Sequence, residues 1–310
     1  MNELPFLNAF AANNVHSAFY LAPLENLASI ALNGILSHNE ISRRGILHRD
    51  VSDPGAQHHR ENRRITVTRL IDSTNSISGL HDLVPLYFNS RNAMLYKLIV
   101  DKKPVCIIEL SLERLFQSIE TFAFSDGNLA SSDSKTYCDV NSVAALPWSD
   151  IQSESWNDDD HQRKQEKKYK TCAELIVSPT AQANSIVKVW VAGPESAEFA
   201  HEQLRIAGAT VNGIEPSTDR FFGISKSADI EQSVRWLNPL DENYPITESA
   251  LGFAVGGFYS RDGECSCAPG LSQTINSPCA YCDEPVLRTT QSPSHLEARR
   301  KTAFRAEPDF

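Results

Sequence analysis

One acidic residue lies within an apolar segment, where a charged side chain needs a specific partner or task. Glu174 is the third residue of Cys172–Ser178, whose composition predicts a buried strand. Side chains of a strand alternate between its two faces, so this carboxylate must enter a cleft or pair with a cation. From the residues alone, a structural ion pair and a catalytic carboxylate both remain open.

Four of the seven cysteines form two close pairs, Cys265 with Cys267 and Cys279 with Cys282. This spacing suits tetrahedral zinc, because each pair offers two sulfurs to one side of the ion. Reduced, unligated cysteines and disulfides are the alternatives, and His295 is a substitute ligand. The three remaining cysteines are expected to be reduced core residues: Cys106, Cys138 and Cys172.

The overall composition of the 310-residue chain is that of a globular protein, with 41% hydrophobic and 22% charged residues. Its net charge of −10 argues against a protein coated in nucleic acid but leaves room for a local basic groove. Two basic stretches, 43–64 and 163–170, could supply one, or could be solvated faces. No membrane span and no secretory signal is recognised, so we expect a cytoplasmic protein.

The elements predicted before residue 128 indicate a mixed α+β domain. A polar loop with one helical turn is expected over 50–62, and an apolar run covers Met94–Val100. The predicted strands are Ala18–Ala22, Leu83–Asn89, Val105–Leu110 and Thr121–Ser125, and the predicted helices are Leu24–Leu36, ending at Asn33-Gly34, and Ser111–Gln117.

The second half of this domain begins with a long polar segment, 128–170, which is expected to be a functional loop. After the strand that holds Glu174, a helix over Pro194–Ala207 lies between strands at Val187–Val191 and Ala209–Val211. This order predicts a β-α-β unit. We place a domain boundary between residues 224 and 225, and we expect 225–310 to be an extension with a flexible tail.

Four segments follow one another along the chain: Leu24–Ser37; Gln57–Arg63; Gly79–Tyr96; and Phe124–Asn128, followed by Asp150-Ile151, Trp156 and Cys172–Val177. In this order they resemble motifs of the DarT family, toxins that ADP-ribosylate bases of single-stranded DNA. The first three are similar to the family's Asn-Leu-x-x-Ile-x-x-x-Gly-Leu-Leu-Ser helix, its Gln-x-x-Arg-x-x-Arg loop and its Leu-His-Asp-Tyr-Val-Pro-Phe-Tyr-Phe-x-x-Arg-Ser-Pro-Met-Leu-Tyr run. The third is the most specific.

The resemblance implies an ADP-ribosyltransferase-like fold that uses NAD, with Glu174 as the catalytic carboxylate. Arg60 is implied as its partner and as the ligand of the NAD pyrophosphate, which a guanidinium can hold through two hydrogen bonds. The remaining NAD pocket is implied to consist of Tyr20, Leu21, Asn26, Gly34, Leu36, Tyr87, Asn89, Met94 and Tyr96. Core packing is the alternative role of Tyr87 and Met94.

The acceptor implied by the resemblance is a nucleobase of single-stranded DNA, thymidine or guanosine. Arg91 and the basic residues Arg163, Lys167 and Lys168 are candidates for phosphate contacts. The implied partner is a macrodomain antitoxin of the DarG type. Zinc at the cysteine pairs would be a structural addition, because the resemblance does not reach them.

One segment departs from the family pattern. The family has His-Ile-Thr-His-x-x-Asn before the first helix, whereas this chain has Tyr20 to Asn26 in the corresponding place, without either histidine. Two alternatives to DNA modification therefore stay open. The same chemistry could act on RNA or protein, since a fold does not fix the acceptor, or the chain could be a non-catalytic module that binds nucleic acid or a partner.

Overall fold

The computed structural model describes residues 3–52, 54–101 and 104–222, in which strands and helices are mixed along the chain. The strands are β1 (Ser17–Pro23), β2 (Ile35–Leu36), β3 (Arg64–Arg69), β4 (Asn75–Gly79), β5 (Val84–Tyr87), β6 (Val105–Ser111), β7 (Thr121–Ser125), β8 (Thr136–Tyr137), β9 (Glu174–Ser178), β10 (Thr180–Ala181), β11 (Ile186–Val191) and β12 (Ile214–Pro216). The α-helices are α1 (Glu3–Ala11), α2 (Leu27–Asn33), α3 (His38–Arg44), α4 (Pro54–Glu61), α5 (Ala93–Val100), α6 (Leu112–Phe116), α7 (Val140–Ala145), α8 (Trp148–Ile151), α9 (His161–Lys170) and α10 (Pro194–Ala207). The short 3₁₀ helices of the same residues are η1 (Leu24–Asn26), η2 (Leu80–Asp82), η3 (Ala183–Ser185) and η4 (Thr218–Arg220).

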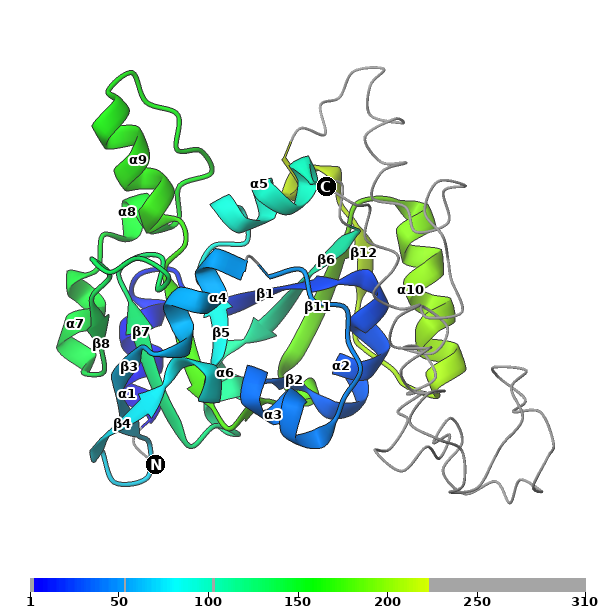
Figure 1. Cartoon of the computed structure of the whole chain (residues 1–310), viewed down its shortest axis with the longest axis horizontal. Coiled ribbons are helices and arrows are strands. Elements are labelled where there is room, and N and C mark those ends of the chain that lie inside the picture. Colours follow the sequence, from blue (N-terminus) through cyan, green and yellow to red (C-terminus); the bar gives the residue numbers. More distant parts are fainter. Residues whose placement is uncertain (1–2, 53, 102–103, 223–310) are drawn as a thin grey trace.

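A ten-stranded sheet forms the centre of the molecule (Figure 1). Its strand order is β12-β11-β6-β1-β5-β9-β7-β3-β4, with β8 paired to β7. Neighbouring strands are antiparallel except β11 and β12, which are parallel and connected through α10. The mixed α+β fold and the β-α-β unit predicted from the sequence are thereby confirmed.

Alternation along the strands sends apolar side chains into cores on both faces of the sheet. On one face, Ala18 and Leu175 belong to the main core, which helices α1, α2, α6, α7, α8 and α10 also build. On the other face, Leu21 and Ile107 pack with Leu95 of α5 in a smaller core. Because β6 is covered on both faces, it reads as a nearly continuous apolar run in the sequence.

The sheet is weakly joined at its middle. Strands β1 and β5 share one residue pair, Phe19 with Tyr87, whereas β1 and β6 are paired from Ser17 to Pro23. Beyond that pair, the chain after β1 continues into α2 and β2, and β2 pairs with β10, which follows β9. The two halves of the sheet are thus connected at Phe19 and again through the small β2–β10 pair.

Three predictions about local structure were wrong in part. The segment 50–62 contains the two-turn helix α4, and the expected loop 128–170 contains β8, α7, α8 and α9. The strand after α10 lies at Ile214–Pro216 and not at Ala209–Val211, because Gly208 and Gly213 both adopt positive φ and make a longer turn. The apolar run from Met94 forms α5, whose N-cap is the side chain of Asn92.

Two further predictions concern membrane-spanning helices and the C-terminal extension. Within the described residues, no helix has the length and apolar character needed to cross a membrane. The domain boundary at 224/225, the extension 225–310 and the four paired cysteines lie outside the described residues.

A close backbone approach generates a stability prediction at Gly34, which has φ 74° and ψ −177° at the end of α2. A Cβ atom there would lie 2.7 Å from the carbonyl oxygen of Ala181. This backbone region is essentially restricted to glycine and costs another residue about 1–3 kcal/mol. We expect Gly34→Ala to lower the free energy of unfolding, measured in urea, by about 3 kcal/mol.

Gly208→Ala is the matched control, because Gly208 also has positive φ but a Cβ atom at this position would meet nothing within 4 Å. It should cost about 1 kcal/mol, the penalty of the left-handed backbone alone. Equal losses in the two variants would show that the approach to β10 is not a constraint.

Candidate active site

The carboxylate of Glu174 is held in a buried ion pair at the start of β9. Its two oxygens accept three contacts from the guanidinium of Arg60, each 3.1 Å long. The backbone N–H of Leu129 donates to Oε1 at 3.2 Å. Glu174 is 1% exposed and Arg60 is 9% exposed. The two residues named as catalytic from the sequence are therefore in direct contact, although 114 positions separate them.

This contact answers part of the question left open by the sequence. Glu174 does pair with a cation, and removal of one partner from such a pair leaves a buried charge that costs several kcal/mol. The pairing does not exhaust Arg60, which has five N–H groups. Its bonds to Glu174 come from Nη1 and Nη2, and the described residues offer no acceptor to Nε. The guanidinium can therefore hold Glu174 and donate to a second anion.

Contacts of the segment after β7 fix the position of the Leu129 amide. Arg63 donates to the backbone carbonyls of Leu129, Ser131 and Ser134 at 2.7, 2.5 and 2.6 Å. The Arg63 guanidinium thus holds the turn by donating to three of its backbone carbonyls. The loop is thus tied to the start of β3, the same stretch of chain that carries Arg60.

A second set of contacts connects β7 to Glu174. The hydroxyl of Ser125 accepts the N–H of Glu174 at 2.9 Å and donates to the carbonyl of Gly127 at 2.7 Å. Gly127 lies against the ring of Tyr169, whose hydroxyl donates to Asp126 at 2.9 Å. These groups position the carboxylate through its own backbone and through the turn beside it.

Three of these positioning residues lie within the motifs, although no role was predicted for them. Arg63 is the second arginine of the Gln57–Arg63 segment, and Ser125 and Gly127 lie within Phe124–Asn128. The motif pattern was the available signal. Their roles became visible only with the tertiary contacts, because their partners lie far away in the sequence.

Two tyrosines lie within electrostatic range of the ion pair. Tyr87 is directly opposite Glu174 in the pairing of β5 with β9. Burial, and then the negative charge of Glu174, raise the pKa of Tyr87 well above its usual value. Burial raises the pKa of Tyr20 to about 12, helped by Asp50 and opposed by Arg60. Both phenols therefore stay protonated at neutral pH and can donate hydrogen bonds.

The other residues expected in the NAD pocket lie in several environments. Leu21 is buried, and the partly buried Met94 packs against the same small core. Asn26 exchanges two hydrogen bonds with the backbone of Arg49, at 2.8 and 2.9 Å, and so holds the loop after α3. Gly34 ends α2, and Leu36 lies in β2, where it pairs with Thr180 of β10.

Two expected pocket residues serve a different part of the surface. Asn89 donates to the carbonyls of Ile151 and Ser153, at 2.8 and 2.9 Å, and so joins the loop after β5 to α8. Tyr96 is 47% exposed and contacts the rings of Trp156 and Phe222 edge-on, with centroids 5.7 and 5.6 Å away. Neither Asn89 nor Tyr96 takes part in the hydrogen bonds between Arg60 and Glu174.

The basic residues predicted to contact DNA differ in how free their charges are. Arg163 is paired with Asp150 at 2.6 Å and with Glu166 at 3.2 Å. Lys167 is paired with Asp158 at 2.7 Å, whereas Lys168 is exposed. Arg91 donates to the backbone carbonyl of Asp219. Helix α9 is therefore partly neutralised by its own surroundings, which the charge pattern of the sequence does not reveal.

The described residues contain no cluster of histidines, cysteines and acids that could hold a metal ion. Among them, Cys106 and Cys172 are buried and free, and Cys138 is half-buried and free. Cys106 and Cys172 are core residues, as expected, whereas Cys138 is not. The predicted zinc ligands Cys265, Cys267, Cys279 and Cys282 lie outside the described residues.

A family model described as "ssDNA thymidine ADP-ribosyltransferase, DarT" matches residues 19–222, which contain every described site residue discussed above. The chain belongs to the DarT family. The match begins in β1 and ends just after η4, so it covers Tyr20, Arg60 and Glu174 together. The resemblance inferred from four short motifs is confirmed over the whole described sheet.

The similar proteins include a DNA ADP-ribosyl transferase-DNA ADP-ribosyl glycohydrolase fusion protein of Thermosipho africanus, 28% identical over 182 residues. This alignment covers 58% of the chain and 43% of the fusion protein, so it spans less than half the length of that relative. A solved structure of Thermosipho africanus DarTG in complex with ADP-ribose matches with a TM-score of 0.53 and 25% identity. It covers 67% of this chain and 51% of the other.

Solved structures of DarT from Thermus sp. 2.9 share the fold over almost their entire length. The complex with ADP-ribosylated single-stranded DNA has a TM-score of 0.54 and 19% identity, covering 67% of this chain and 97% of the other. The complex with NAD⁺ has a TM-score of 0.51, also at 19% identity, and covers 67% and 98%. The DarT-type fold thus accounts for the described part of the chain.

The buried ion pair predicts a large stability effect at Arg60. We expect Arg60→Ala to lower the free energy of unfolding in urea by about 3 kcal/mol, because the carboxylate of Glu174 would remain buried without its partner. The control is Arg43→Ala, which removes an exposed guanidinium from Glu40 and should leave stability nearly unchanged. Similar losses in both variants would contradict the buried pair.

The contact between Gly127 and Tyr169 predicts a second effect. A Cβ atom at residue 127 would lie 2.2 Å from the tyrosine ring, so Gly127→Ala must displace the ring or the turn. We expect a loss of about 1–3 kcal/mol in the same urea measurement. Adding Tyr169→Ala to this variant removes the clash and should recover part of the loss. A Gly127→Ala protein as stable as wild type would rule the constraint out.

Proposed function

We propose that this chain transfers ADP-ribose from NAD⁺ to thymidine bases of single-stranded DNA, and that it acts as a toxin by modifying DNA. The observation that carries the proposal is the placement of Glu174, buried at the start of β9 and held by Arg60 and the Leu129 amide, within the residues that match the DarT family. The Thermus sp. 2.9 DarT complexes with NAD⁺ and with ADP-ribosylated single-stranded DNA support both substrates.

The proposed reaction breaks one glycosidic bond and forms another. The bond between nicotinamide and ribose breaks, and its electron pair leaves with nicotinamide. A ring nitrogen of the base then bonds to the ribose carbon and loses its proton. Positive charge develops on the ribose as in glycoside hydrolysis, and a nearby carboxylate stabilises it. The negative charge of Glu174 stabilises the ribose in this way, and the same carboxylate accepts the proton of the base.

Arg60 links the binding of NAD to the availability of a Glu174 oxygen that can accept a proton. A carboxylate offers about four lone-pair positions, and Glu174 uses four contacts, three to Arg60 and one to Leu129. A proton can be accepted only when one of these contacts is given up. The Nε of Arg60 donates to the NAD pyrophosphate, and the shift of the guanidinium toward that anion gives up one contact and frees an oxygen of Glu174.

The tyrosines fit the nicotinamide side of the site. The missing family histidine is replaced by Tyr20, whose pKa of about 12 keeps its phenol a hydrogen-bond donor. Tyr87 is also kept protonated, and it faces the same side of the sheet as Glu174. Tyr87, a neutral donor beside a buried carboxylate, can orient a ribose hydroxyl or the carboxamide without adding charge.

Replacement of the carboxylate tests the catalytic role. We expect Glu174→Gln to lower transfer of labelled ADP-ribose to a thymidine-containing single-stranded oligonucleotide at least about 100-fold. Its affinity for NAD⁺ should be retained, because the amide preserves the shape of the side chain. Glu61→Gln, an exposed change on the same helix as Arg60, is the control and should transfer like wild type.

Equal transfer by wild type and Glu174→Gln would overturn the assignment. Parallel reactions with RNA, with protein and with an oligonucleotide that lacks thymidine separate the proposed acceptor from the others. A wild-type protein that neither hydrolyses NAD⁺ nor transfers ADP-ribose from it would instead be the non-catalytic module considered from the sequence.

A partner that removes the modification follows from the same proposal. The Thermosipho relative joins a DNA ADP-ribosyl transferase to a DNA ADP-ribosyl glycohydrolase in one chain. We infer a macrodomain antitoxin of the DarG type as the corresponding partner here, supplied by a separate chain or by a further domain. Such an enzyme should release ADP-ribose from an oligonucleotide modified by this protein.

A further inference from the structure

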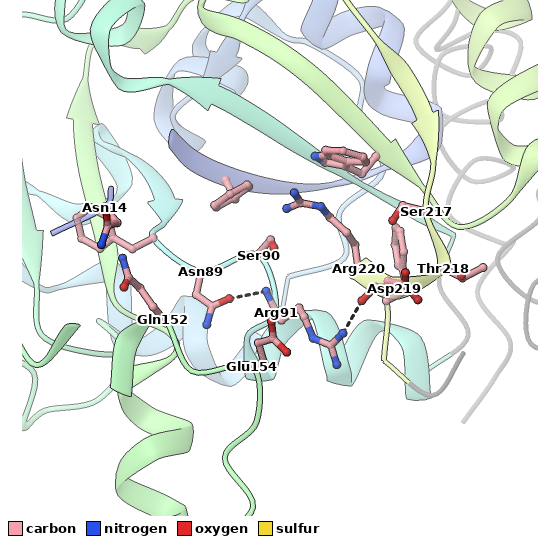
Figure 2. A pocket seen from close by; sticks show the side chains of 14 residues that line it. Asn14, Asn89, Ser90, Arg91, Gln152, Glu154, Ser217, Thr218, Asp219 and Arg220 are labelled. Atoms are coloured by element: carbon pink, nitrogen blue, oxygen red, sulfur yellow. Dashed lines mark hydrogen bonds between the residues drawn. The ribbon is translucent and has the colours of Figure 1, made fainter. Parts of the chain in front are cut away.

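A pocket of about 780 Å³ lies on the same face of the sheet as Glu174 but is built from other residues. It is lined by the loop after β5, the segment after α8 and the segment around η4, and it includes Phe19, Trp190, Arg91 and Arg220. In Figure 2, the Arg220 side chain extends into the space that the labelled residues surround. None of the residues that hold Glu174 lines this pocket.

Arg220 is a cation held by aromatic rings and by no acid of the described chain. Its guanidinium carbon lies 4.1 Å from the ring centroid of Trp190 and 6.0 Å from that of Phe19. Trp190 is itself fixed, because its indole N–H donates to Glu109 at 2.9 Å. Cation–π contacts position a guanidinium without neutralising it. Arg220 therefore keeps its full attraction for an incoming anion.

Arg91 adds a second guanidinium to the lining. Its Nη1 donates to the backbone carbonyl of Asp219, and its guanidinium carbon lies 4.7 Å above the ring of Phe222. Its Nε is buried and has no hydrogen-bond partner among the described residues. Two carboxylates, of Glu154 and Asp219, also line the pocket, but both residues are exposed, so solvent screens them more than the half-buried Arg220.

The pocket lies close to the proposed reaction centre, two strands away from Glu174. Phe19 pairs with Tyr87, and Tyr87 pairs with Glu174, so the three side chains share one face on adjacent strands. Two strand spacings separate Phe19 from Glu174, which is about 10 Å. A single strand with its acceptor base at Glu174 would carry a neighbouring phosphate into the pocket.

We propose that this pocket binds a phosphodiester group of the single-stranded nucleic acid beside the acceptor base, through Arg220 and Arg91. The inference rests on the proposed function for the identity of the strand. The shared chemistry is a phosphate, which could also come from the NAD pyrophosphate. The assignment to the nucleic acid follows from the lining of the pocket, which contains neither Arg60 nor any other residue that holds Glu174.

The test measures binding and not transfer, so it is independent of the reaction. Anisotropy of a fluorescent single-stranded oligonucleotide, without NAD⁺, is recorded with the full chain over a range of salt concentrations. We expect Arg220→Gln to raise the Kd about tenfold and to lower the slope of log K against log salt by about 0.7, the value for one phosphate on a single strand. Arg91→Gln should act in the same direction.

Arg205→Gln is the matched control, because Arg205 is an exposed arginine on α10 that pairs with Glu202 and does not line the pocket. It should leave both the Kd and the salt slope unchanged. The Michaelis constant for NAD⁺, measured by NAD⁺ hydrolysis, should be unchanged in Arg220→Gln. Circular dichroism melts of all variants confirm that they are folded.

The outcomes separate the two proposals. Unchanged oligonucleotide binding in folded Arg220→Gln and Arg91→Gln overturns the pocket assignment even if wild type transfers ADP-ribose to DNA. A raised Michaelis constant for NAD⁺ with unchanged oligonucleotide binding overturns it as well and assigns the phosphate to NAD. Arginine-dependent binding without any transfer supports the pocket and overturns the proposed function alone.

Discussion

The contact between Glu174 and Arg60 is the constraint to which much of the described structure is connected. A carboxylate that is 1% exposed needs polar partners inside the protein, and a guanidinium and a backbone N–H supply them. Arg60 is brought there by α4, which contacts η2, although the sequence of α4 is polar and contains two histidines. The helix is held by this pair and by the contact of Gln57 with His81, at 3.0 Å, more than by any apolar face.

The same constraint explains why the segment after β7 is arranged around Glu174. Arg63 holds three carbonyls of the turn, and the turn in return presents the Leu129 amide to the carboxylate. One arginine of the motif thus binds the acid directly, and the next one binds the backbone that supports it. The described residues around the carboxylate are positioned before any substrate arrives, which is what electrostatic stabilisation requires.

The weak junction between β1 and β5 places the two halves of the proposed chemistry side by side. Tyr20 and Leu21 continue along β1, away from the pair formed by Phe19 and Tyr87. Glu174 lies one strand beyond Tyr87, and the pocket of Arg220 begins at Phe19. A continuous sheet would have filled this region with ladder hydrogen bonds. The single pair instead leaves the strand ends available for ligands on either side.

Much of the fold could be read from the sequence because local patterns decide it. Short apolar runs bounded by turns located β1, β6, β7 and β9, and Gly34 and Gly208 marked the ends of two helices. Only one helical turn was predicted where α4 has two, and the helices within 128–170 were missed; α4 and α9 are polar, so their sequences carry no apolar periodicity. Their N-caps, such as Asp160 on α9, were present but are weak signals alone.

The sequence by itself determined the family and the strand that carries Glu174, and through the family motifs it implied that Arg60 acts together with Glu174. Only the tertiary structure decided that the two side chains touch, that Arg163 and Lys167 are already neutralised, and that Arg220 is not neutralised within the described residues. The physical reason is that a motif records which residue types are needed. Burial and the choice of ion-pair partner depend on residues far apart in the chain, and only folding brings those residues together.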